Sequence, residues 1–138
     1  CANIYGLRDM NLSRLIPNTI LKILTGKKPQ IYSGVLHFKR EFLFIEDVCE
    51  AYHLLSNKGE AGEIYNIGDD EFVTIQEAVE HISEILNFNG EYEIIEKDFL
   101  EIPFQYMSAD KLKSLGWRKS HSFKEGLIKT IEWYKNNN

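Results

Sequence analysis

The feature that most limits how this chain can fold is the segment of residues 74–86, where apolar side chains recur at the spacing of one helix face. The segment opens with Thr74 and, three residues later, Glu77, a capping-box pair that satisfies free backbone N–H groups at a helix start. The apolar positions that follow are Ile75, Ala78, Val79, Ile82, Ile85 and Leu86. The pattern predicts a helix whose apolar face packs on a further layer.

The remaining chain alternates between short helical and short extended patterns. Helices are predicted over residues 14–24, 45–55, 110–115 and 123–134, and strands over residues 1–5, 30–32, 42–44, 63–67 and 92–95. A second capping box, Ser122 with Glu125, opens the last helix. In the helix at 45–55, Asp47 is expected near the start and Cys49 as a small buried apolar residue. These elements indicate a small α/β domain, or α+β when the chain is taken alone.

Composition excludes several classes of function. With 138 residues the chain supports one core, and its net charge of -5 argues against a nucleic-acid surface. No apolar run approaches the roughly 20 residues of a membrane span. Two cysteines are too few for a disulfide framework or a four-ligand zinc site. We therefore expect a cytoplasmic protein that holds no metal and binds neither nucleic acid nor membrane.

The sequence carries no recognisable catalytic motif. The four histidines lie far apart, and no G-x-S-x-G elbow is present. The nine glycines form no G-x-G-x-x-G turn, and none of the seven tyrosines has a lysine four residues later. We assign no catalytic residue to this chain.

Three arginines, Arg8, Arg14 and Arg40, fall in or beside predicted loops. Polar residues accompany them: Asn3, Asn11, Ser13, Asn66 and Gln105. The planar guanidinium matches phosphate oxygens, and loops at strand ends are where open α/β sheets hold ligands. The combination favours an anionic small ligand such as a diphosphate. On the residues alone, however, ordinary solvent-exposed arginines are the simpler explanation.

Five ordered motifs favour the ligand-binding explanation over that of ordinary solvent-exposed arginines. They are N-I-Y-G followed by S-R-L-I-P at residues 3–17, R-E-F-L-F-I-E-D-V at 40–48, G-E-I-Y-N-I-G at 62–68, K-x-x-x-L-G-W at 111–117, and E-G-L-x-x-T-I-E-W-Y at 125–134. Together they cover nearly the whole chain. This series resembles the extended short-chain dehydrogenase/reductases, the NAD-dependent nucleotide-sugar epimerases and 4,6-dehydratases.

Two segments resemble one branch of that family. Residues 8–14 (R-D-M-N-L-S-R) and 102–106 (I-P-F-Q-Y) look closest to the CDP-glucose 4,6-dehydratase-like members. Gln105 stands where many dTDP- and UDP-sugar relatives carry an arginine, which puts a phosphate-binding role for this residue in doubt.

The resemblance implies which portion of such an enzyme is present. Residues 1–138 would form a single substrate-binding domain, the C-terminal substrate lobe of a Rossmann-type enzyme. Residues 1–6 would end a Rossmann core strand, and residues 7–138 would supply the substrate lobe and the C-terminal helices. The glycine turn for NAD or NADP and the Y-x-x-x-K residues would precede Cys1. The cofactor would then belong to the full-length protein, a homodimer, with none bound by this chain alone.

The resemblance also implies a reaction and a set of binding residues. NAD(P)+ would oxidise the nucleotide-diphosphate sugar at C4, after which a dehydratase eliminates water across C5–C6 and an epimerase returns the hydride to the other face. This portion would hold the diphosphate. The expected substrate-binding residues are Arg40 at the phosphates, Asn3 and Arg14 at the sugar or diphosphate, and Asn66, Gln105, Ser13 and Asn11 around them.

Alternatives remain open for the residues and for the chain. Asn3 and Asn66 suit strand-end turns, and Arg40 suits an ion pair with Glu41 or Glu46. The whole chain could also be a standalone ligand-binding module or a self-associating interaction module. Exposed strand edges and apolar faces would serve the latter.

Overall fold

The computed structural model describes residues 1–97 and 101–137. Its elements, in chain order, are β1 (Asn3–Tyr5), α1 (Leu15–Leu24), β2 (Gln30–Tyr32), a 3-10 turn (Ser33–Val35), β3 (Lys39–Phe44), α2 (Ile45–Lys58), β4 (Phe72–Thr74), α3 (Ile75–Ile85), β5 (Glu93–Ile95), α4 (Asp110–Ser114) and α5 (Phe123–Asn137). The five predicted helices are all present. Four of the five predicted strands are also confirmed, within a few residues at their ends.

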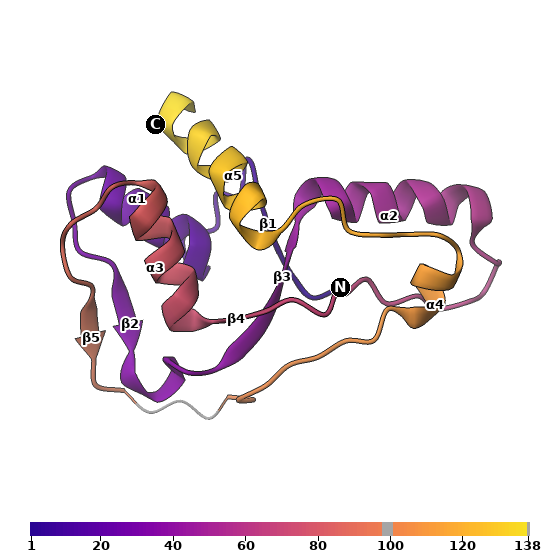
Figure 1. Ribbon diagram of the computed structural model, residues 1–138, viewed down its shortest axis with the longest axis horizontal. Coiled ribbons are helices and arrows are strands. Elements are labelled where there is room, and N and C mark those ends of the chain that lie inside the picture. The colour runs from indigo at the N-terminus through magenta and orange to yellow at the C-terminus, as the bar shows by residue number, and fades with distance from the viewer. Residues whose placement is uncertain (98–100, 138) are drawn as a thin grey trace.

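Two small sheets organise these elements (Figure 1). In the three-stranded sheet β3 is central: it runs parallel to β1, with Ile4 opposite Leu43, and antiparallel to β4. The second sheet pairs β2 with β5 in parallel and lies beside α1 and α3 in Figure 1. Parallel pairs require long crossover connections, and here α1 and α3 lie within those connections.

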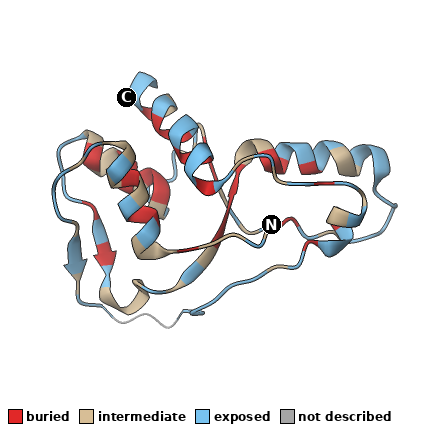
Figure 2. Ribbon diagram, viewed as in Figure 1, coloured by how far each residue is buried: buried red, intermediate tan, exposed pale blue. Residues whose placement is uncertain are grey.

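The two faces of β3 bury different apolar clusters. Phe44 packs with α1, α3 and α5 through Ile20, Ile82 and Leu127. Leu43, the preceding residue, packs with α2, α4 and the segment that carries Trp117. Consecutive strand residues point to opposite faces, so this one strand joins both clusters. Figure 2 shows the buried residues concentrated along β3 and on the helix faces turned toward it.

Both predicted capping boxes are confirmed. The Thr74 hydroxyl accepts from the Glu77 backbone N–H at 3.1 Å, and the Glu77 carboxylate accepts from the Thr74 N–H at 2.7 Å. Ser122 and Glu125 exchange the same two bonds at 3.3 and 2.8 Å. These short-range signals place the starts of α3 and α5 correctly.

Two expectations about individual residues and elements are wrong, and one strand was missed. Residues 63–67 form no strand; the segment runs beside β1 and receives the Ala2 N–H on the Ile67 carbonyl, without a ladder. The short strand β4, by contrast, was not anticipated. Cys49 is exposed, because α2 buries the side that carries Asp47, Val48 and Ala51. Among the described residues no helix is long and apolar enough to cross a membrane.

Candidate functional site

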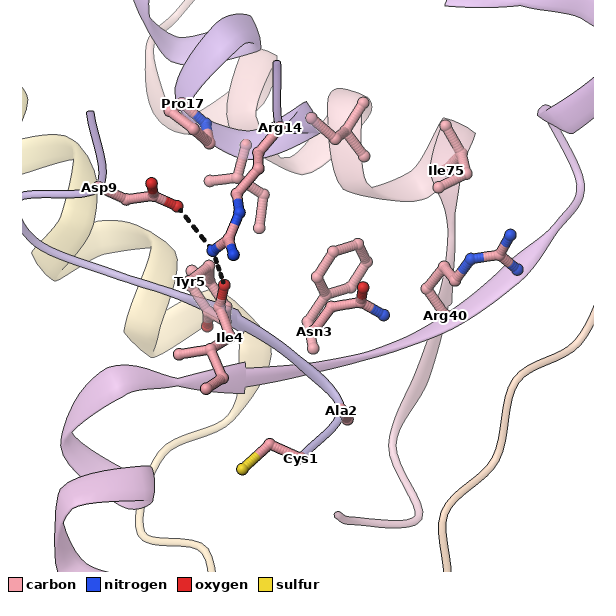
Figure 3. A pocket seen from close by; sticks show the side chains of 13 residues that line it. Cys1, Ala2, Asn3, Ile4, Tyr5, Asp9, Arg14, Pro17, Arg40 and Ile75 are labelled. Atoms are coloured by element: carbon pink, nitrogen blue, oxygen red, sulfur yellow. Dashed lines mark hydrogen bonds and ion pairs between the residues drawn. The ribbon is translucent and has the colours of Figure 1, made fainter. Parts of the chain in front are cut away.

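A pocket of about 520 Å³ opens where β1, β3 and the start of α1 meet. Its lining includes three of the expected binding residues, Asn3, Arg14 and Arg40, together with Asp9 and Ile75. We call it the arginine pocket. Figure 3 shows Arg14 and Arg40 at opposite ends of it, with Asn3 between them. The strand β1, the strand β3 and the loop before α1 therefore bring together residues that lie up to 37 positions apart in the sequence.

Two further hollows adjoin the arginine pocket. One, of about 550 Å³, runs along β2 and shares Arg14, Leu15 and Ile75 with it. The other, of about 730 Å³, lies beside residues 101–105 and shares Arg40 with it. Glu101 lines both of these outer hollows. The three spaces thus share lining residues: Arg14 and Arg40 each border the arginine pocket and one outer hollow, and Glu101 borders both outer hollows. We call the three spaces together the cleft.

Arg14 is held in place by its own chain. Its Nη1 donates to the Ile4 carbonyl at 3.2 Å and lies 3.3 Å from the Asp9 carboxylate, as Figure 3 shows. It sits at the N-cap of α1 without a side-chain cap, where a cation opposes the helix dipole. Its side chain remains 54% exposed, so donors are available to a bound anion. A ligand phosphate here would relieve that unfavourable dipole interaction.

Arg40 is much less exposed, at 12% of its side chain. Its Nη2 pairs with Glu101 at 2.9 Å, its Nη1 donates to the Lys39 carbonyl at 3.1 Å, and its guanidinium lies 5.5 Å from the centre of the Phe38 ring. The alternative of a pair with Glu41 or Glu46 is wrong. The reason lies in how those two acids are already held.

Glu41 and Glu46 each have another partner. Glu41 lies buried, where its carboxylate accepts from the Asp69 backbone N–H. Burial raises the pKa of this carboxyl. Glu46 lies on α2 and pairs with Lys129 at 2.7 Å. Neither carboxylate neutralises Arg40.

Asn3 contributes to strand register as well as to the pocket. Its Nδ2 donates to the Glu41 backbone carbonyl at 3.1 Å, which ties β1 to β3. The residue is nevertheless exposed along the pocket. Its side-chain oxygen accepts no hydrogen bond from the described residues, and Figure 3 shows the amide between Arg14 and Arg40. The strand-end role and a ligand role are compatible in this geometry.

The other expected residues are distributed more widely. Ser13 lines the hollow beside β2, and Gln105 lines the one beside Arg40. Asn11 shapes the loop, because its Oδ1 accepts from both the N–H and the hydroxyl of Ser13 at 3.1 and 2.6 Å. Asn66 and Arg8 are exposed and line none of these three hollows. The role of Asn66 as a ligand contact stays a prediction.

Several cleft residues had no sequence signal. Lys22 and Tyr32 line the hollow beside β2, and Asp9 lines the arginine pocket. Glu101 joins the two outer hollows from a connection that precedes α4. Asp9 stands in the motif of residues 8–14 without having been singled out there, whereas Lys22, Tyr32 and Glu101 stand in no motif. The pairing of Glu101 with Arg40, which lies 61 residues away in the sequence, is found only once the fold is known.

The loop that carries Asp9 is fixed from the far end of the chain. The Tyr134 hydroxyl on α5 donates to the Asp9 backbone carbonyl. Burial, and then the Asp9 charge, raise the pKa of Tyr134 to about 12. The hydroxyl therefore stays neutral and remains a donor at ordinary pH. This bond holds in place the loop from which Arg14 reaches the pocket.

Glycines of a dinucleotide cradle need an open side that admits a pyrophosphate. At Gly6, Gly68 and Gly126 an added Cβ would meet the chain's own atoms. At Gly26, Gly62 and Gly116 nothing lies within 4 Å, but these three glycines lie far apart in the sequence and form no G-x-G-x-x-G turn. Among the described residues no group of three or more His, Cys, Asp or Glu could hold a metal.

Comparison with known proteins agrees with the motifs. Residues 1–68 match the NAD dependent epimerase/dehydratase family. The dTDP-D-glucose 4,6-dehydratase of Homo sapiens is 36% identical over 143 residues, which is 99% of this chain and 40% of that protein.

Two solved structures share the fold. The UDP-glucose 4-epimerase of Thermotoga maritima, with UDP-glucose, superposes with a TM-score of 0.90 at 25% identity, over 99% of this chain and 44% of that one. The dTDP-glucose 4,6-dehydratase of Bacillus anthracis, in complex with NAD, gives 0.88 at 31% identity, over 100% and 44%. The α/β, Rossmann-type fold is confirmed.

The chain spans less than half the length of these relatives. Their names include dTDP- and UDP-sugar enzymes, so the CDP-glucose branch stays a prediction. The resemblance itself is confirmed at the level of the family. The chain is a homologue of the NAD dependent epimerase/dehydratase family and corresponds to part of the length of its members.

Proposed function

We propose that this chain binds the nucleotide-diphosphate sugar of an NAD-dependent epimerase or 4,6-dehydratase. The observation that carries the proposal is the shared pocket of Asn3, Arg14 and Arg40. Two guanidinium groups and an amide border this pocket, and in Figure 3 the Arg40 guanidinium points away from Asn3. Such groups match an anion with several oxygens. The relatives named above act on sugars carried by dTDP and UDP, which supplies the substrate class.

The cleft has the shape that an extended ligand needs. The arginine pocket shares Arg14 and Ile75 with the hollow beside β2, where Ile31 and Tyr32 offer apolar and aromatic surface. A diphosphate near Arg40 and Arg14 would direct the nucleoside into this hollow. The sugar would then lie toward Asn3. Because parts of the substrate remote from the reacting carbon supply binding energy, these contacts orient the sugar for reaction.

The experiment uses the full-length protein that contains this chain. Replacing Arg40 by Gln removes the charge and keeps a polar side chain of similar reach. We expect KM for the nucleotide sugar to rise about tenfold, with NAD affinity nearly unchanged. Lys135→Gln, on the exposed end of α5, is the matched control for charge. An unaltered KM in Arg40→Gln would contradict the proposal.

A self-associating module is the second candidate, favoured by exposed apolar side chains. Ile64 is 84% exposed, and Met10 and Ile102 are also largely exposed. Sedimentation equilibrium of the chain, combined with titration by UDP, CDP and dTDP, separates the two functions. A populated oligomer without nucleotide affinity supports the second candidate. Nucleotide binding that depends on Arg40 supports the first, in a full-length protein that we expect to be a homodimer.

A further inference from the structure

The ion pair between Arg40 and Glu101 joins two residues that each border more than one part of the cleft. Arg40 lines the arginine pocket and the hollow beside residues 101–105, while Glu101 lines that hollow and the one along β2. The pair joins residues 61 positions apart. A carboxylate therefore already stands where the proposed function puts a phosphate.

The two partners differ in how firmly they are held. Arg40 is 12% exposed and fixed by the Lys39 carbonyl and the Phe38 ring, so its position hardly depends on Glu101. Glu101 is 51% exposed, and among the described residues only Arg40 donates a hydrogen bond to it. A pair with one solvated partner contributes little net stability, so a stronger anion can displace it. A diphosphate is such an anion, because it offers several charged oxygens to the guanidinium fork.

We propose that Glu101 is a resident competitor: in the ligand-free chain it occupies the anion position on Arg40 and must leave when a diphosphate binds. The inference rests on the proposed function of the arginine pocket. Its consequence is that Glu101 sets the affinity of the cleft. It keeps Arg40 neutralised in the absence of substrate, and it admits only ligands whose phosphates outcompete a carboxylate.

The test is calorimetric titration of the chain with UDP and with inorganic pyrophosphate. Glu101→Gln keeps the size of the side chain and removes the competing charge. We expect the Kd of both probes to fall about fivefold, because that factor is equivalent to the free energy of an ordinary exposed ion pair. Glu96→Gln, an exposed position for which the described chain shows no ion pair, changes the net charge equally and is expected to leave affinity within twofold.

A double-mutant cycle distinguishes this inference from the proposed function. If Glu101 acts through Arg40, Glu101→Gln gives no gain in an Arg40→Gln background. Equal gains in both backgrounds, or a gain equal to that of Glu96→Gln, overturn the inference while the proposed function stands. Probe affinity that does not change in Arg40→Gln alone contradicts the proposed function instead. Circular dichroism of each variant confirms that the fold is retained.

Discussion

The hydroxyl of Tyr5 donates a hydrogen bond to the backbone carbonyl of Phe123 at 2.9 Å, across 118 residues of sequence. This bond joins β1, which lines the arginine pocket, to the first turn of α5. Burial is the main cause that raises the pKa of the Tyr5 hydroxyl, with the charges of Glu71 and Asp47 adding to it. The group is therefore a neutral donor throughout the ordinary pH range.

Replacing Tyr5 by Phe is expected to lower the free energy of unfolding by about 1 kcal/mol, the usual net contribution of a buried hydrogen bond. The ring contacts with Phe42, Phe44 and Phe123 survive the change, so the loss isolates the hydroxyl. Urea denaturation measures the difference. Tyr52→Phe, on the exposed side of α2, is the control and is expected to change stability by less than about 0.5 kcal/mol. Equal effects of both substitutions would contradict this role.

Gly126 lets α5 approach the sheet closely. A Cβ at this position would meet the Tyr5 hydroxyl and the Phe44 side chain. Gly126→Ala in a helix ordinarily stabilises by about 1 kcal/mol, whereas overpacking a buried contact costs about 1–3 kcal/mol. We expect a net loss of unfolding free energy. Asn136→Ala, exposed on the same helix, tests propensity alone and is expected to be neutral or stabilising. A stabilised Gly126→Ala chain would show that α5 can shift away.

Elements with strong local signals were predictable, and those defined by pairing were not. The starts of α3 and α5 follow from two capping boxes, in each of which the two partners lie three residues apart. The expected strand at 63–67 has the right composition, but forms no ladder with a neighbouring strand. The strand β4 covers only Phe72–Thr74, immediately before the helix cap, and exists because β3 is there to pair with it.

The site residues, too, were predictable where a sequence motif marked them and were missed where tertiary contacts place them. Asn3, Arg14 and Arg40 were found through family motifs and do share a pocket. Glu101 was missed because its contact with Arg40 depends on a connection 61 residues away folding back along β3. Cys49 was misplaced because a helical pattern identifies an apolar face without showing where the sheet contacts it. Charge partners and helix orientation are tertiary properties, so no local pattern carries them.

Glu41 is expected to make stability depend on pH in a specific direction. Burial raises the pKa of its carboxyl above the ordinary 4.5, so the folded chain holds the proton more tightly than the unfolded chain does. Ionisation therefore costs stability, and the cost appears as pH rises from 4.5 through the raised pKa. In Glu41→Gln that cost is absent. The unfolding free energy of the variant minus that of the parent chain should increase with pH and then level off.

Chemical denaturation of both chains between about pH 5 and pH 8 measures this difference. The range avoids Asp69: burial opposes its ionisation, but the hydrogen bond and charge of Lys119 lower its pKa overall, so its contribution is lost only in stronger acid. Glu91→Gln, at an exposed position, is the control and should give a flat difference. A difference that decreases as pH rises would mean that the ionised Glu41 stabilises the fold.

Arg14 and Arg8 offer a matched pair for the binding proposal, because they lie in one loop and carry the same charge. Arg14 lines the arginine pocket at the N-terminus of α1, whereas Arg8 is exposed and lines none of the three hollows. Arg14→Gln is expected to weaken UDP binding about fivefold, while Arg8→Gln should change it by less than twofold. Each substitution removes one positive charge and so changes the long-range electrostatic attraction of UDP equally. A difference in UDP affinity between the two variants therefore reports direct contact. Calorimetric titration with UDP at two salt concentrations provides the measurement. Equal losses of UDP affinity in the two variants would mean that Arg14 acts only through general electrostatic attraction.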